Sequence, residues 1–372
     1  MDRVYFLNSY IESAQGNLEE TIKRVTQGNI DIGHKSVHNL NGDIEVPYYH
    51  FKNSVPEDPQ SIFNLLKESV KKAILPLDES EKKRTALIVG TSLADFHLIN
   101  IMENIILDKK QKYLSEKRSI DTYARLIAKE LGLNDFTMTI NTACTSSANA
   151  IIEGSNLIKS GIFDHIVVAG VEIFSKMTTS GFNALSMLST DTIKPFDKNR
   201  DGLILGEGVS SILLGKEKSP WSLKGAYSNC NSKTVTSVGS NGTEYVDVMK
   251  KALENAQIDA KDITAIKAHA TGTESNDLAE INAMTQVFDE SIRFTALKPY
   301  LGHTLGVCGA LEIALFMKFI DNGLIPKTIG CNEPIIEKYR PISKDFSCSN
   351  GLFMCNYFGF GGNNTSIILQ RV

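Results

Sequence analysis

The sequence contains no pair of cysteines spaced C-x-x-C, the arrangement that most often marks a structural zinc site. Its six cysteines also lack the spacing typical of the disulfide framework of a small secreted domain. We therefore expect reduced thiols, a cytoplasmic protein and no metal centre.

Long apolar runs are missing as well. No stretch approaches the roughly 20 apolar residues that a membrane-spanning helix needs. At the N-terminus a short apolar run ends at Asn8 and is followed by Glu12, without the longer apolar segment and cleavage site of a signal peptide. We expect a protein with no membrane segment.

Neither sign of charge dominates. The chain of 372 residues has 39 Lys and Arg against 43 Asp and Glu, which gives a net charge of -4. A nucleic-acid-binding protein usually carries a basic stripe, so we expect no nucleic-acid partner. The hydrophobic share of 42% is ordinary for a globular protein and is ample for a large core or two domains.

Short apolar runs alternate with longer segments of helical periodicity. Before residue 216 the predicted strands span 86–89, 136–140, 165–169 and 211–214, and the predicted helices 61–73, 119–131 and 148–159. A polar, proline-containing segment at 216–233 is predicted to be a connection. The alternation then resumes, with helices at 244–256, 277–287 and 310–320 and strands at 265–268, 293–296 and 352–357. This pattern predicts an α/β fold whose sheets are covered by helices.

The first candidate site is Cys144, in the segment N-T-A-C-T-S-S-A between a predicted strand and a predicted helix. Backbone N–H groups at a helix N-terminus stabilise a thiolate, so we expect the pKa of this thiol to be lowered. Buried structural cysteines are common, and this segment alone fits a nucleophile and a core residue equally.

Two histidines follow predicted strands in the same way. His269 lies in K-A-H-A-T-G-T, and His303 closes K-P-Y-L-G-H, which begins at Lys298. The segment N-Y-F-G-F-G-G-N-N, which contains Phe360, follows the last predicted strand. Each segment alone fits a core histidine or a polar turn. Together they follow strand ends, where sites of α/β folds lie, and can converge on one pocket.

In this order and spacing, the four segments resemble the β-ketoacyl synthase family of the thiolase superfamily. The resemblance covers nearly all of the chain from about Thr85. It includes G-F-N-A-L at 181–185 and P-F-D-K-N-R-D-G at 195–202, closed by G-E-G at 206–208. It implies dimers and a five-layered α-β-α-β-α fold built from two similar halves. Residues 1–215 would carry the nucleophilic cysteine and residues 216–372 both histidines.

The resemblance implies a role for each matching residue. Cys144 would accept the acyl group, and His269, His303 and Lys298 would complete the catalytic set. The backbone N–H groups of Cys144 and Phe360 would form an oxyanion hole, and the Phe360 side chain would be a gate. Thr271, Thr273 and Leu93 would contact the phosphopantetheine arm or the acyl chain. Asp277 and Glu312 match structural acidic residues near the site.

The implied reaction is a decarboxylative Claisen condensation. An acyl group moves from acyl carrier protein to Cys144, malonyl-acyl carrier protein loses carbon dioxide, and the resulting enolate attacks the acyl thioester. Neutral histidines that donate from Nε2 would hold the enolate oxygen. No cofactor is implied, because decarboxylation supplies the driving force. The implied partner is acyl carrier protein, in fatty-acid or polyketide elongation.

Several departures keep other interpretations open. Ala270 stands where the family usually has glycine, Asn363 and Asn364 replace Thr-Asn, the loop 90–95 has few glycines, and the N-terminal portion is weakly patterned. One alternative is a partner subunit like the chain-length factors of polyketide synthases, although those usually lose the cysteine. A homodimer and a heterodimer with another ketosynthase-like subunit both stay open. A thiolase would need a second cysteine near the C-terminal glycine-rich turn.

Overall fold

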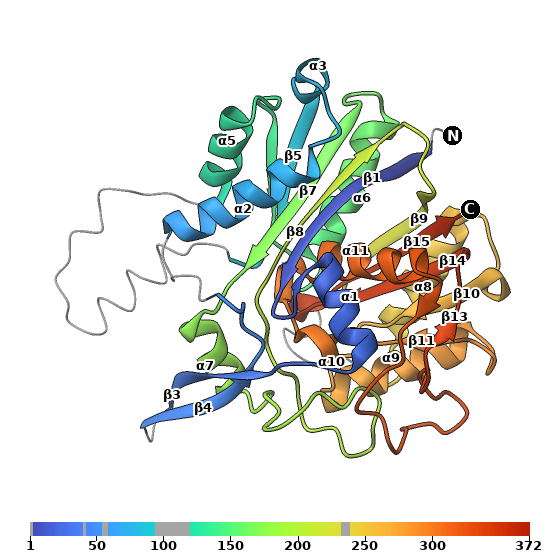
Figure 1. Ribbon diagram of the computed structural model, residues 1–372. Coiled ribbons are helices and arrows are strands. Elements are labelled where there is room, and N and C mark those ends of the chain that lie inside the picture. The colour runs from blue at the N-terminus through green and yellow to red at the C-terminus, as the bar shows by residue number, and fades with distance from the viewer. Residues whose placement is uncertain (1–2, 40–41, 54–58, 94–119, 232–238) are drawn as a thin grey trace.

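The structure is a computed structural model that describes residues 3–39, 42–53, 59–93, 120–231 and 239–372 (Figure 1). Its main feature is a long mixed sheet made of two sets of five strands. The first set runs in the order β1 (Val4–Ser13), β8 (Gly208–Gly215), β7 (His165–Glu172), β5 (Thr85–Gly90) and β6 (Thr137–Ile140). The second runs in the order β9 (Trp221–Cys230), β15 (Asn363–Arg371), β14 (Gly351–Phe358), β10 (Ile263–Lys267) and β11 (Phe294–Thr295).

The two sets share one topology. In each, the first three strands are antiparallel neighbours and the last two add in parallel. A short antiparallel pairing of β1 with β9, with Val4 opposite Leu223, joins the sets. The predicted boundary at 215 and 216 falls between β8 and β9, and the division of the chain there into two domains stays a prediction.

Helices lie on both faces and between the two sets, which confirms the predicted five layers. Helices α6 and α11 form the central layer, and α6 packs on strands of both sets. Figure 1 shows α2 and α5 over the first set and α8 and α9 beside the second. Their bounds are α2 (Pro59–Ala73), α5 (Ile120–Glu130), α6 (Ser146–Lys159), α8 (Thr243–Ala256), α9 (Glu274–Val287) and α11 (Cys308–Asp321).

The burial of alternate side chains explains why the predicted strands read as unbroken apolar runs. In β5, Ala86 and Ile88 point into the core around the central helices, whereas Leu87 and Val89 point into the core under α2 and α5. A strand covered on both faces gains from an apolar residue at every position. The predicted strands in β5, β6, β7, β8, β10, β11 and β14 are therefore confirmed, with small changes at their ends.

Two sequence interpretations were wrong. The segment 216–233 is not only a connection, because β9 occupies most of it. The buried residues of β9 lie in its first half, at Trp221, Ser222, Leu223 and Gly225, and its second half is only partly buried and carries no apolar run. The N-terminal portion, which looked weakly patterned, supplies β1 in the middle of the sheet.

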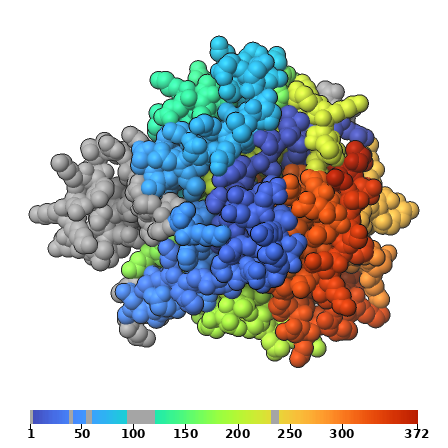
Figure 2. Space-filling view, in the orientation of Figure 1, coloured from blue at the N-terminus to red at the C-terminus, as the bar shows by residue number. Residues whose placement is uncertain are grey.

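The N-terminal portion also covers the central layer. Figure 2 shows it in blue, across the middle of one face and next to the C-terminal residues in orange. The remaining elements are short: β2 (Gly16–Asn17), α1 (Leu18–Gln27), β3 (Gly33–Asn39), β4 (Gly42–Tyr48), α3 (Glu79–Lys82), α7 (Lys176–Ala184), α10 (Lys298–Leu301), β12 (Leu324–Ile325) and β13 (Phe346–Ser347). In the described part of the chain, 3₁₀ turns lie at Ala260–Asp262, Leu305–Val307 and Phe360–Gly362.

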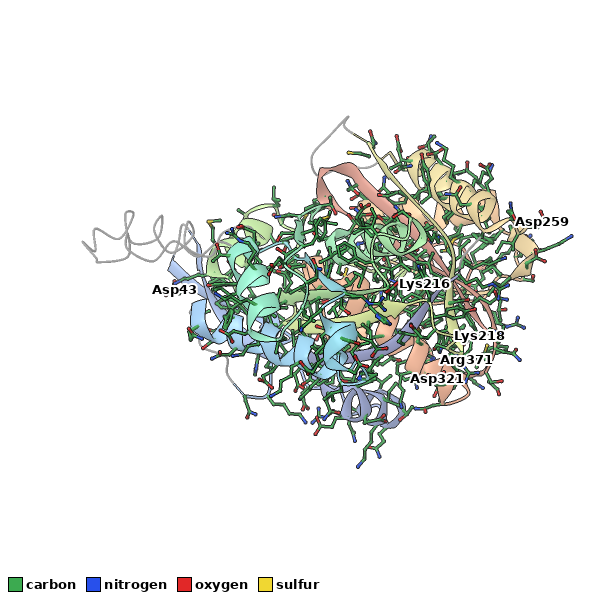
Figure 3. The ribbon with its side chains drawn as sticks, turned by 90° about the horizontal axis from the view of Figure 1, so that it is seen from above. Asp43, Lys216, Lys218, Asp259, Asp321 and Arg371 are labelled. Atoms are coloured by element: carbon green, nitrogen blue, oxygen red, sulfur yellow. The ribbon has the colours of Figure 1, made fainter. Side chains whose placement is uncertain are left out.

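The C-terminal strand is tied to the central layer at its end. Figure 3 shows Arg371 of β15 beside Asp321, the last residue of α11, and the Arg371 Nε lies 2.7 Å from the Asp321 carboxylate. The indole N–H of Trp221 donates to the same carboxylate over 2.9 Å. None of the helices in the described part of the chain has the length and apolar character needed to cross a membrane.

Candidate active site

Cys144 lies in a sharp turn between β6 and α6. Ala143, just before it, has a left-handed backbone with φ of 53°, which an L-residue adopts only at a cost in free energy. The hydroxyl of Ser146 closes the turn, since it accepts from the N–H of Thr142 over 2.9 Å and donates to the carbonyl of Ala143 over 2.6 Å. The turn holds the Cys144 side chain at the N-terminal end of α6, in the central layer.

His303 meets this cysteine from the other half of the chain. Its Nε2 lies 3.1 Å from the sulfur of Cys144, and both side chains are buried. Helices α6 and α11 come close enough for this because Gly309 has no side chain. A Cβ at that position would lie 2.4 Å from the backbone nitrogen of Ala148.

His269 completes a pair of histidines. Its ring centroid lies 5.4 Å from that of His303, with the ring planes nearly perpendicular at 86°. Its Nδ1 lies 3.3 Å from the Nζ of Lys298. An ammonium group can only donate, so Nδ1 is the acceptor and the neutral ring carries its proton on Nε2.

The backbone of His269 is fixed by a carboxylate that the sequence interpretation missed. One oxygen of Glu280 accepts from the N–H of His269 over 2.7 Å, and the other from the N–H of Ala270 over 2.8 Å. Glu280 lies three residues after Asp277 on α9, and both are buried. That helical spacing of two acidic residues was the available signal.

Lys298 belongs to a buried ion cluster. The Glu312 carboxylate accepts from the Nζ of Lys298 over 2.8 Å and from the Nζ of Lys267 over 2.6 Å. All three side chains are at most 1% exposed. Lys267 was not among the predicted residues, although a lysine directly before A-H-A at the end of an apolar strand was a signal for it.

The charges and the burial keep both histidines neutral. Burial lowers the pKa of His269 and of His303 well below the usual 6.5, and the positive charge of Lys298 lowers both further. For Cys144 the expected lowering was wrong. Burial raises the pKa of this thiol to about 11, and the opposing effect of Lys298 is smaller. The resting site therefore holds a thiol and two neutral imidazoles.

Phe360 lies opposite the sulfur, in the glycine-rich turn. Its backbone N–H and that of Cys144 are both placed to hydrogen-bond the sulfur and thereby favour the thiolate. Its ring stacks on Phe182 of α7, with centroids 5.5 Å apart and planes 19° from parallel. The next two residues, Gly361 and Gly362, have φ of 83° and 81°, which glycine adopts readily.

A cavity leads from the sulfur and the two histidines towards the surface. Thr271 and Thr273 line it, and their hydroxyl oxygens lie 2.9 Å apart. The other walls are mixed. Phe182, Leu203, Tyr245, Phe358 and Phe360 are aromatic or aliphatic, and Asn231, Glu244, Ser275, Asn276 and Asn364 are polar. A passage with both apolar and hydrogen-bonding side chains suits an extended thioester with amide groups.

Leu93 does not line this cavity. It is buried in the core beneath α2 and α5, together with Phe63 and Tyr123, and its backbone N–H donates to the hydroxyl of Thr91. The loop 90–95 in which it stands was expected beside the acyl chain, and Ala94 and Asp95 lie outside the described residues. Contact of Leu93 with an acyl chain stays a prediction.

The two acidic matches lie close to the site and brace it. The Asp277 carboxylate accepts from the N–H groups of Gly272 and Phe196, which fixes the turn that carries Thr271 and Thr273. Glu312 holds the two buried lysines. A second thiol, that of Cys308, donates to the carbonyl of Cys144 over 3.1 Å and was not singled out from the sequence. Among the described residues, no cluster of three metal-ligating side chains is present.

Comparison with known proteins shows which family this chain is similar to. Residues 57–219 match the family model described as "Beta-ketoacyl synthase, N-terminal domain", and residues 222–332 match "Beta-ketoacyl synthase, C-terminal domain". A putative 3-oxoacyl-[acyl-carrier-protein] synthase, mitochondrial, of Schizosaccharomyces pombe is 28% identical over 334 residues, which are 80% of this chain and 77% of that protein. The tetracenomycin polyketide synthase ketoacyl synthase alpha subunit of Streptomyces glaucescens is 29% identical over 270 residues, 66% of this chain and 63% of that protein.

Solved structures show the same fold. A chain from the ketosynthase ApeO in complex with its chain length factor ApeC, from Xenorhabdus doucetiae, aligns with a TM-score of 0.85 and 24% identity, over 100% of this chain and 98% of that one. A chain from a type II PKS acyl-carrier protein in complex with its ketosynthase aligns with a TM-score of 0.87 and 20% identity, over 100% and 99% of the two chains.

Proposed function

The chain belongs to the β-ketoacyl synthase family, and from this premise we propose that it is an acyltransferase that joins an acyl group held on Cys144 to a malonyl unit on acyl carrier protein. One observation carries the proposal. The sulfur of Cys144 lies 3.1 Å from the Nε2 of His303 in a cavity that also holds a second neutral histidine, His269. A hydrolase needs a cysteine and one histidine, and does not account for the second histidine or for the buried Lys298.

The first step is acyl transfer. The Cys144 thiol passes its proton to the Nε2 of His303 as the sulfur attacks the carbonyl carbon of the acyl thioester. The negative charge on the carbonyl oxygen is held by the backbone N–H groups of Cys144 and Phe360, which face the sulfur. The carbon–sulfur bond to the carrier breaks, the carrier leaves as a thiol with the proton from His303, and the acyl group stays on Cys144.

The second step is decarboxylation of the malonyl thioester. The bond between the α-carbon and the carboxylate breaks and carbon dioxide leaves. The electron pair of the broken bond stays on the remaining thioester and forms an enolate. The oxygen of the enolate needs donors. The neutral ring of His269 supplies one from Nε2, and His303, which has returned its Nε2 proton to the carrier, supplies a second after its remaining proton moves from Nδ1 to Nε2. Imidazolium ions would instead bind the malonyl carboxylate and resist its loss, so the lowered pKa of both rings suits this step.

Condensation completes the cycle. The enolate carbon attacks the acyl carbonyl on Cys144, a carbon–carbon bond forms, and the carbon–sulfur bond to Cys144 breaks. The product leaves as a β-ketoacyl thioester on the carrier, and the thiolate is protonated again. We propose that no metal or redox cofactor takes part, because the loss of carbon dioxide drives the reaction.

We propose that the cavity binds a thioester on a phosphopantetheine arm. The hydroxyl groups of Thr271 and Thr273, which line the cavity, would hydrogen-bond the amides of that arm. Acyl carrier protein is the proposed partner, as in the solved ketosynthase complex. We also propose a dimer, since ApeO is paired with a chain length factor. The second subunit is either a copy of this chain or a ketosynthase-like partner, and light scattering of the purified protein decides between them.

Intact-protein mass spectrometry tests the proposal. The purified chain is incubated with a panel of acyl-acyl carrier proteins, and we expect a mass increase equal to the acyl group. The increase must vanish in Cys144→Ala and persist in Cys308→Ala, which removes the neighbouring buried thiol. Added malonyl-acyl carrier protein should then release the acyl group as a β-ketoacyl product. Folded protein that no carrier acylates would refute the catalytic assignment and favour a partner subunit.

A further inference from the structure

Glu312 holds a buried lysine on each of its two carboxylate oxygens. Oε1 accepts from Lys298, at the start of α10, and Oε2 accepts from Lys267, the last residue of β10. Lys267 also donates to the backbone carbonyl of Asn356 over 3.0 Å, and its Nζ lies 3.6 Å from the centre of the Tyr357 ring. These contacts all lie inside the protein, and Lys267 is not among the residues that line the cavity.

The cluster has an excess of positive charge. Two ammonium groups face one carboxylate, all at most 1% exposed, so one positive charge is left over in the core. Burying an uncompensated charge destabilises a protein, and a neutral side chain in place of Lys267 would avoid that cost. The pKa of Glu312 is nevertheless lowered, because the two ammonium groups outweigh the effect of burial. The two ammonium groups therefore favour the ionised form of Glu312, and within this cluster they outnumber the carboxylate two to one.

This excess charge lies beside the reacting groups. Lys298 contacts His269, and the charges of both lysines lower the pKa of His269 and of His303, after the larger effect of burial. Other ionisable groups lie around the two rings and the thiol: Cys144, Cys308, Glu172, Glu280, Glu312, Tyr245 and Tyr357, which are buried or nearly so, and Glu244, which lines the cavity. During decarboxylation and condensation an enolate and then the leaving thiolate of Cys144 form at this place, and both are negative.

We propose that Lys267 is a positioning residue of the condensation: it fixes Glu312 so that Lys298 points at the Nδ1 of His269, and it supplies the positive charge that the enolate compensates. This inference rests on the proposed function. Lys267 touches no substrate and acts through Glu312 and Lys298. The cost of its buried charge in the resting protein is recovered when the negative charge develops, which is how a preorganised site lowers a barrier.

The substitution Lys267→Met tests this, since it keeps an unbranched side chain of similar length and removes the charge. We expect condensation to fall about 10²-fold, with Cys144 still acylated by acyl-acyl carrier protein. We also expect the acidic limb of the pH profile for decarboxylation to move to higher pH. With one positive charge fewer, the histidines protonate at a higher pH and lose the neutral form that donates to the enolate. Lys267→Arg, which keeps the charge, should leave that limb in place.

Chemical rescue separates the charge from mere packing. In Lys267→Ala the lost ammonium leaves a space against Glu312 and Asn356, so propylammonium ions should restore part of the condensation rate. Tetramethylammonium at the same ionic strength has no N–H to donate and should not. Lys318→Ala, on the partly exposed face of α11, is the matched lysine control and should show normal rates without amine.

The inference is overturned if Lys267→Met condenses at the wild-type rate with an unshifted acidic limb. It is also overturned if the rate falls but neither the limb moves nor an amine restores it, because a structural role alone would then suffice. If Lys267→Met does not fold, Lys267→Arg replaces it as the test. An acidic limb that moves in Lys267→Arg, although the charge is kept, would then overturn the inference. Failure of the proposed function looks different, since the wild-type chain would then produce no β-ketoacyl thioester at all.

Discussion

Cys144 and His303 face each other across the central layer, with 3.1 Å between sulfur and Nε2 although 159 residues separate them in the chain. Cys144 lies just before α6, and His303 lies a few residues before α11. The contact therefore depends on how closely these two helices approach each other.

The glycine at the contact between α6 and α11 should be essential. Gly309→Ala places a Cβ 2.4 Å from the nitrogen of Ala148, a backbone atom that cannot rotate away. We expect a loss of about 1–3 kcal/mol in the free energy of unfolding, and a larger loss of acylation, because the helices must separate. Gly181→Ala is the control, since no atom lies within 4 Å of its added Cβ and Gly181 is inside helix α7. Chemical denaturation and mass spectrometry of the acyl-enzyme measure both effects, and equal behaviour of the two variants would contradict the close packing.

The two histidines should fail at different steps. His303→Ala removes the acceptor of the thiol proton, so we expect acylation to slow by about 10²–10⁴-fold. His269→Ala leaves the Cys144–His303 contact intact but removes one donor for the enolate. We expect it to accumulate acyl-enzyme and to release carbon dioxide from malonyl-acyl carrier protein about 10²–10³-fold more slowly. Acyl-enzyme mass and carbon dioxide release, measured on the same samples, separate the steps. Equal loss of both steps in both variants would show that the rings act as one unit.

The pH dependence should be set by burial. With a Cys144 pKa of about 11, the free thiol should react with iodoacetamide slowly at neutral pH and progressively faster towards pH 11. The exposed Cys230 is an internal reference in the same digest. For condensation, the lowered pKa of His269 and His303 places the acidic limb below pH 6.5, since the neutral rings persist to that pH. An acidic limb above pH 7, or Cys144 alkylated faster than Cys230 at neutral pH, would contradict the neutral resting state.

The carboxylate under His269 should matter for stability and for rate. Glu280→Gln replaces one oxygen with an amide group that faces a backbone N–H, so one hydrogen bond is lost and two donors oppose each other. We expect a loss of about 1–3 kcal/mol in the free energy of unfolding and slower condensation. Glu274→Gln, on an exposed position of the same helix, should change neither. A Glu280→Gln variant as stable and as fast as wild type would mean that the His269 backbone needs no brace.

The sequence was sufficient to place the reactive residues but not to describe their state. Cys144, His269, Lys298 and His303 all follow strands that read as apolar runs, and the structure brings them together. What failed was the pKa of Cys144, because the effect of burial depends on residues that are remote in the chain. The effect of the helix N-terminus is local and could be predicted from the sequence. The larger effect, the desolvation of the Cys144 thiol on burial, could not.

The missed elements have a similar explanation. β9 and β15 carry many polar residues where they flank the site, so neither shows the unbroken apolar run of β5 or β7. Lys267 was overlooked because a lysine in a strand is usually on the surface, and only its partner Glu312, 45 residues later, makes its burial tolerable. Leu93 was placed by resemblance alone; it is buried beneath α2 and α5, and its contact with an acyl chain stays a prediction.

The shared topology of the two sets of strands has a consequence for the cysteine and the histidine. β6 and β11 are equivalent edge strands, and α6 and α11 are the helices that follow them. The turn with Cys144 and the turn with His303 therefore occupy equivalent positions in the two sets of strands, and they face each other across the central layer. Two equivalent turns could carry identical groups. Here one turn carries the thiol of Cys144 and the other carries the imidazole of His303, a base. The reaction centre therefore lies where the two sets meet, and neither half of the chain holds the complete set of reacting groups.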